Sequence, residues 1–61
     1  PRDIALQYAA TKSAYETASA QVERNKRLLS RQAISVQEYE ISLSNYQKAK
    51  YGVRTVQQQH A

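Results

Sequence analysis

Few residues of the types that carry out catalysis occur in this sequence, and they are poorly placed for it. The one histidine, His60, lies in a polar C-terminal stretch with no carboxylate nearby. Glu38 and Glu40 form a carboxylate pair, but side chains two residues apart on a helix point toward different faces. Ser30 and Ser35 have no neighbouring base in the sequence. We therefore expect a protein that is not an enzyme.

The groups that hold metals and cofactors are also scarce. The 61 residues include no cysteine and one histidine, so neither a thiolate site nor a structural zinc site is expected. With one glycine in the chain, there is no glycine-rich loop to hold phosphates. The sequence predicts no metal and no cofactor.

Four of the nine basic residues fall between Arg24 and Arg31, the other two being Lys26 and Arg27. Basic side chains at a helix C-terminus complement the helix dipole, and this explains the cluster without any ligand. A nucleic-acid site would need more charge and exposed aromatic rings for stacking. We predict no nucleic acid as partner. The alternative interpretation is a generic coiled-coil hairpin that binds another partner through its helix faces, or nucleic acid through this basic cluster.

A second kind of binding chemistry involves Arg24, Leu28 and Ser35. Arg24 and Leu28 are four residues apart, so on a helix they share one face. Leu29 continues the apolar stripe described below, so we expect Leu28 to point away from it and to be exposed. An exposed leucine beside an arginine and a small polar serine is typical of a protein docking patch.

The elements that position this patch follow from Ser35 and Glu38, which are spaced as a capping box. This pattern predicts a helix start in mid-chain. Glycine and proline are nearly absent, and most residues favour helices. We predict one helix over about 3–31, a turn over about 32–34 and a second helix over about 35–58.

Both predicted helices carry a stripe at alternating spacings of three and four, which is a heptad pattern. The stripe of the first helix comprises Ile4, Tyr8, Thr11, Tyr15, Ala18, Val22, Asn25 and Leu29. That of the second comprises Val36, Tyr39, Leu43, Tyr46, Lys50, Val53 and Gln57, bordered by Ala49 and Val56. Helices joined by so short a turn lie antiparallel. The predicted fold is therefore all-α, a two-helix antiparallel coiled-coil hairpin.

A chain of this size with so narrow a seam is marginally stable alone or self-associates. No apolar run approaches the roughly 20 residues needed to span a bilayer. The chain begins with proline rather than methionine, so we expect it to be a piece excised from a larger protein.

The chain from Ala5 to about Val56 resembles the α-helical hairpin of bacterial periplasmic adaptors, the membrane fusion proteins of tripartite multidrug efflux pumps of the AcrA/MexA type. Arg24, Leu28 and Ser35 match the arginine, leucine and serine of that family's tip in type and spacing. The run from Ala33 to Glu40 adds to the resemblance, and the spacing of alanines and tyrosines in both arms matches more loosely.

The resemblance implies a docking function in the periplasm. The hairpin tip would bind a TolC-like outer-membrane channel through Arg24, Leu28 and Ser35. Hairpins would associate side by side, and domains outside this chain would reach an inner-membrane transporter and anchor the parent protein there. Adaptors of type I secretion systems and ABC-type exporters belong to the same family, so the resemblance leaves the transporter open.

Overall fold

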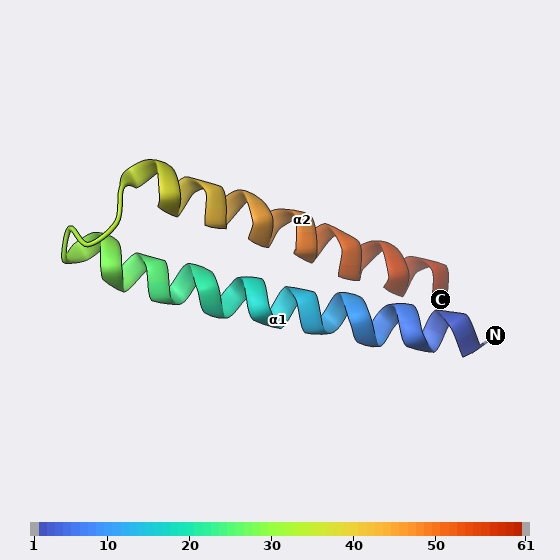
Figure 1. The fold of residues 1–61 in the computed structure, drawn as a ribbon. Coiled ribbons are helices and arrows are strands. Elements are labelled where there is room, and N and C mark those ends of the chain that lie inside the picture. The colour runs from blue at the N-terminus through green and yellow to red at the C-terminus, as the bar shows by residue number, and fades with distance from the viewer. Residues whose placement is uncertain (1, 61) are drawn as a thin grey trace.

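The computed structural model describes residues 2–60, and the side chains of Arg2, Gln59 and His60 lie outside the described part. Two helices, α1 (Arg2–Ser30) and α2 (Val36–His60), run antiparallel and form one hairpin (Figure 1). The molecule is a rod of 47 × 13 × 12 Å. The predicted all-α hairpin is confirmed, with α1 beginning and ending one residue earlier than expected. The sequence led us to expect no catalytic function for His60, and the side chain of this residue lies outside the described part.

The reversal of the chain begins with a C-terminal cap on α1. The amide of Ala33 donates to the carbonyl of Leu28 at 2.8 Å, and that of Gln32 donates to the carbonyl of Leu29 at 2.9 Å. This pair of bonds is the Schellman motif, in which the residue after the helix adopts the left-handed conformation. Gln32 takes that position with φ of 60°. Glycine usually occupies it, since it has no Cβ to clash there.

The start of α2 is the predicted capping box. The amide of Glu38 donates to Ser35 Oγ at 3.0 Å, and the amide of Ser35 donates to Glu38 Oε1 at 3.1 Å. The Ser35 hydroxyl also donates to Glu38 Oε1 at 3.3 Å. Two amides that lack partners within the helix are thus satisfied by side chains of the same turn.

The seam between the helices is narrow, as its small and polar residues imply. In the described residues, Val56 is the one buried apolar side chain, at 8% exposure, and no side chain is fully buried. Two polar residues, Asn25 and Ser42, are buried as well, at 8% and 6%. The Ser42 hydroxyl donates to the carbonyl of Tyr39 at 2.6 Å, so its polar group is satisfied within α2. The one buried apolar residue therefore lies near the termini, and the two buried polar residues lie nearer the turn.

The predicted stripe of α2 was wrong at three positions. Val36, Lys50 and Gln57 are exposed, with Val36 at 59%. The seam instead uses Ser42, Ala49 and Val56, together with the expected Tyr39, Leu43, Tyr46 and Val53. A stripe extrapolated from Val36 fails because α2 turns that side chain away from α1, and small residues on the neighbouring stripe allow closer approach.

The middle of the seam is joined by a pair of tyrosines. The rings of Tyr15 and Tyr46 stack with centroids 5.4 Å apart and planes inclined by 29°, and their hydroxyl oxygens are 3.3 Å apart. This hydrogen bond, and then the proximity of the second phenol, raises the pKa of Tyr15 above its ordinary value of 10.0. The pair contributes a polar contact and a stacked contact at one level of the seam.

No helix in the described part is long and apolar enough to cross a membrane.

Candidate docking site at the hairpin tip

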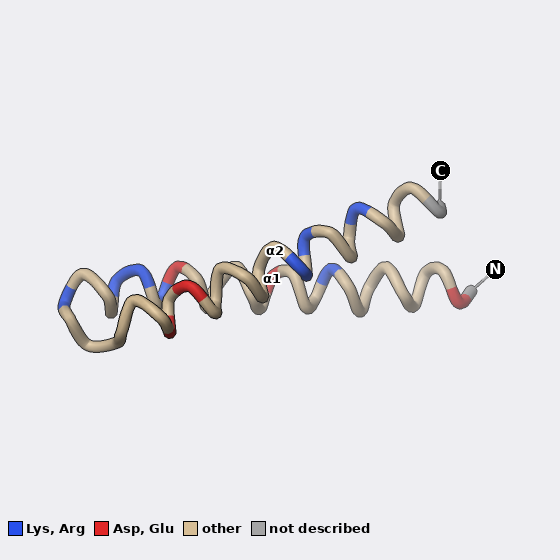
Figure 2. The backbone as a smooth tube through the Cα atoms, turned by 90° about the horizontal axis from the view of Figure 1, so that it is seen from above, with Lys and Arg blue, Asp and Glu red and all other residues tan. Residues whose placement is uncertain are grey.

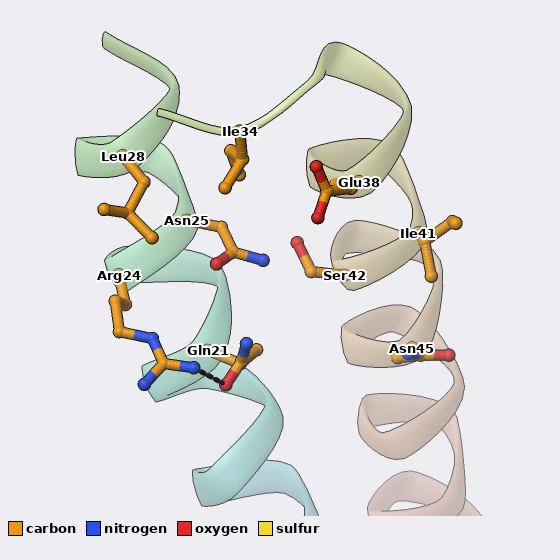
Figure 3. A pocket seen from close by; sticks show the side chains of 9 residues that line it. All are labelled: Gln21, Arg24, Asn25, Leu28, Ile34, Glu38, Ile41, Ser42 and Asn45. Atoms are coloured by element: carbon orange, nitrogen blue, oxygen red, sulfur yellow. Dashed lines mark hydrogen bonds between the residues drawn. The ribbon is translucent and has the colours of Figure 1, made fainter. Parts of the chain in front are cut away.

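The tip of the hairpin carries a groove of about 430 Å³ on one face, between α1 and α2 (Figure 3). We call it the tip groove. It is lined by Gln21, Arg24, Asn25 and Leu28 of α1, by Ile34 of the connection, and by Glu38, Ile41, Ser42 and Asn45 of α2. Both helices thus contribute to it, and two of the three residues singled out from the sequence are among its walls.

Arg24 stands on the α1 rim of the tip groove. Its side chain is exposed, and one terminal nitrogen of the guanidinium donates to Gln21 Oε1 at 2.9 Å (Figure 3). This contact with a residue one turn earlier holds the guanidinium along the rim. A guanidinium has five N–H donors, so others stay available for carbonyl or carboxylate oxygens of a partner.

Leu28 lies one turn from Arg24 on the same rim, as its spacing predicted. Its exposure was predicted wrongly, because the side chain is half-buried. The Schellman turn that follows α1 folds the connection back, so Ile34 lines the same groove. Together they form an apolar patch at the turn end of the groove.

Ser35 is exposed, but it does not line the tip groove. Its hydroxyl is engaged with Glu38, which does line the groove on the α2 side. The structure therefore brings Arg24 and Leu28 together and places Ser35 outside the groove at the start of α2. By capping α2, Ser35 fixes the position of the first turn of that helix. It thereby also fixes the position of Glu38.

Two further features of the groove escaped the reasoning from sequence. Ile41 is 54% exposed and lines the α2 side, opposite Leu28. Like Leu28, it is an apolar residue off the seam, and the same argument would have found it. Asn25 and Ser42 face one another between the helices (Figure 3). Asn25 was noted as a polar interruption of the stripe, but its polar counterpart on α2 depends on a register that only the structure provides.

Charged residues are unevenly distributed along the hairpin (Figure 2). The end of α1 and the residue after it are basic, from Arg24 to Arg31, and the start of α2 carries Glu38 and Glu40. Farther from the turn, α2 carries Lys48, Lys50 and Arg54. In the described residues, no three His, Cys, Asp or Glu side chains gather closely enough to hold a metal ion.

No protein-family model matches the chain, and none of the curated proteins does. The hairpin is similar to part of a solved structure from Bacteroides eggerthii DSM 20697, described as a "Putative efflux transporter". The two share 72% identical residues, with a TM-score of 0.91. The similarity covers 95% of this chain but 18% of that protein. The chain is thus a near relative of one segment of a larger protein that is named for efflux.

Proposed function

We propose that this chain is the α-helical hairpin of an efflux-pump adaptor in the periplasm, and that its tip docks onto a TolC-like outer-membrane channel. The observation that carries the proposal is the 72% identity with a segment of an efflux protein. The resemblance of Arg24, Leu28 and Ser35 to the tip of the adaptor family adds the docking partner. In this proposal the parent protein is anchored in the inner membrane, and its other domains contact the transporter.

The shape of the hairpin supports this proposal. Both ends of the described chain lie at one end of the rod, and the turn lies at the other (Figure 1). A hairpin with this arrangement can be inserted into another domain through its two adjacent ends. The 47 Å length would then carry the tip groove away from that domain. Neighbouring hairpins would pack side by side and cover faces that the thin seam leaves in water.

The chemistry of the tip supports a docking function without catalysis. Leu28 and Ile34 offer apolar surface that the partner would cover, and removing this surface from water would favour binding. Arg24 on the rim would donate to carbonyl or carboxylate oxygens of the channel. Ser35 would act chiefly as the N-cap of α2. The exposed part of its side chain would also contact the channel.

Drug susceptibility tests the proposal in cells that depend on the full-length protein. Arg24→Asp and Leu28→Ser should abolish export, because both change the docking surface and leave the seam intact. The matched controls are Lys12→Asp and Leu6→Ser, which make the same changes at exposed positions far from the tip. Full resistance in both tip variants, at normal protein levels, would contradict the docking function.

A further inference from the structure

The tyrosines are the side chains of this hairpin that lose a single electron most easily. The chain contains no cysteine or methionine, whose sulfur atoms oxidants usually attack first, and no tryptophan. It contains five tyrosines, at positions 8, 15, 39, 46 and 51, and all five lie within the described part. The fate of a tyrosyl radical depends on what lies next to it, so the arrangement of these rings determines the product of oxidation.

The rings of Tyr15 and Tyr46 meet at their reactive ends. Their hydroxyl oxygens are 3.3 Å apart and their centroids 5.4 Å apart, so the two rings converge toward the hydroxyls. The ring carbons next to the hydroxyls therefore lie at the close end of the pair. In a tyrosyl radical these carbons share the unpaired electron with the oxygen, and they are the atoms that join when two tyrosines form dityrosine.

Small oxidants can reach this pair although it belongs to the seam. Both side chains are half-buried rather than buried. A hollow of about 220 Å³ opens beside Tyr15 and is also lined by Lys50, Val53, Arg54 and Gln57. An oxidant that enters the hollow meets the Tyr15 ring, and Tyr46 is stacked directly against that ring. A radical formed on one ring is therefore held against the other.

The other three tyrosines have no such neighbour. Tyr15 and Tyr46 are the one stacked aromatic pair among the residues that the structure describes. Tyr8 and Tyr39 are half-buried without a stacked ring, and Tyr51 is 70% exposed. A radical on any of these three meets a second tyrosine only after a larger movement of the chain or in another molecule.

We propose that Tyr15 and Tyr46 form a modification site, at which a one-electron oxidant joins α1 to α2 through dityrosine. Each phenol gives one electron to the oxidant and its hydroxyl proton to water. The two radicals form one carbon–carbon bond between the ring positions next to the hydroxyls. The hydrogens on those two carbons then move to the oxygens, which restores both hydroxyls and both aromatic rings. The pair loses two hydrogen atoms in total and consumes two equivalents of oxidant.

The bond locks the middle of the hairpin, whatever partner the tip binds. Tyr15 and Tyr46 are 31 residues apart in the sequence, so the bond closes a loop that contains the turn. A cross-link of this kind stabilises the folded state mainly by restricting the unfolded chain. The described part of the seam has one buried apolar side chain, Val56, so few noncovalent contacts oppose separation of the helices. Oxidation therefore turns a thinly packed hairpin into one whose helices cannot part at mid-length.

Mass spectrometry of the full-length protein after controlled oxidation tests this inference. Light-activated ruthenium tris-bipyridine with persulfate serves as the one-electron oxidant. Trypsin cleaves after lysine and arginine, so Tyr15 falls in the peptide 13–24 and Tyr46 in the peptide 32–48. We expect these two peptides to be joined, with a combined mass lowered by two hydrogen atoms. Fragmentation should place the bond at Tyr46 rather than at Tyr39, which is in the same peptide.

Two controls separate the pair from other sources of the same product. Tyr46→Phe removes one hydroxyl of the pair and should reduce the joined peptides to background. Tyr51→Phe removes the same group from the exposed tyrosine and should leave their yield unchanged. Oxidation of a mixture of unlabelled protein and protein labelled with a heavy nitrogen isotope should give joined peptides of one label only, since the bond forms within one hairpin.

Three outcomes overturn the inference. The joined peptides could be absent under conditions that oxidise Tyr51, which would mean that the paired rings do not couple. Equal yields from the Tyr46→Phe and Tyr51→Phe variants would place the bond elsewhere. A large share of peptides with mixed labels would assign the cross-link to contact between two copies.

Hydrogen exchange provides a second measurement, of the lock itself. Backbone amides of α1 and α2 should exchange several-fold more slowly in the oxidised protein than in the untreated protein, because the bond limits opening of the hairpin. The Tyr46→Phe variant, treated with the same oxidant, should exchange like its untreated form. Unchanged exchange in the oxidised parent protein would contradict the proposed lock.

Discussion

Replacing Ser35 with alanine should lower the free energy of unfolding of the hairpin. The structure shows which hydrogen bonds of the capping box this change removes and which one it leaves. The Ser35 hydroxyl accepts from the amide of Glu38 at 3.0 Å and donates to Glu38 Oε1 at 3.3 Å, and both contacts vanish in Ser35→Ala. The amide of residue 35 can still donate to Glu38 Oε1. Loss of such a cap typically costs about 1 kcal/mol. Ser35 is exposed, so water reaches the freed amide and we expect no more than that.

Urea unfolding followed by far-ultraviolet circular dichroism measures this free energy of unfolding. Ser35→Thr is the matched control, since it keeps a hydroxyl in the same place and should differ from the parent by only a few tenths of a kcal/mol. If Ser35→Ala leaves the stability unchanged, or if the alanine and threonine variants lose the same amount, the cap does not hold the start of α2. The account of how Glu38 is positioned would then be wrong.

Three other predictions concern the turn and the seam. Gln32→Gly should stabilise the hairpin by about 0.5–1 kcal/mol in the same unfolding assay, because φ of 60° strains any residue with a Cβ; a loss of stability would contradict this. Tyr46→Phe should lower the pKa of Tyr15 toward 10.0 in an ultraviolet tyrosinate titration. Since the fold raises that pKa, the contribution of the pair is complete below pH 10.0 and is lost as the pH rises through the raised pKa; an unchanged titration would refute the hydrogen bond. Val56→Ala should cost about 1–2 kcal/mol, as expected for two buried methyl groups, whereas Val36→Ala should cost less than about 0.5 kcal/mol; equal costs would contradict the assigned seam.

Local chemistry made most of the fold predictable. Ser35 and Glu38 define a helix start through bonds within one turn, so their spacing is sufficient evidence. Once a helix start lies in mid-chain, the short connection requires antiparallel helices. The same local reasoning placed Arg24 and Leu28 on one face, and the tip groove contains both.

Features that depend on contact between the helices could not be predicted so well. On α2, the stripes that continue through Lys50 and through Ala49 are nearly equivalent by spacing alone. The structure selects Ala49 because small side chains allow the helices to approach. Leu28 shares the groove with Ile34, which follows the left-handed turn at Gln32. The sequence around Gln32 does not predict the left-handed conformation, because glycine or asparagine usually occupies that position.

The affinity of the purified full-length protein for its purified outer-membrane channel tests the central claim most directly. We predict that Leu28→Ser weakens this binding about three- to tenfold, because covering a whole leucine side chain contributes about 1.5–3 kcal/mol and only about half of Leu28 remains to be covered. Leu6→Ser, at a more exposed leucine far from the tip, should bind like the parent protein. Doubling the salt concentration should change the affinity little, whereas binding to nucleic acid through the basic tip would weaken steeply. An unchanged affinity of the Leu28→Ser variant would contradict the account.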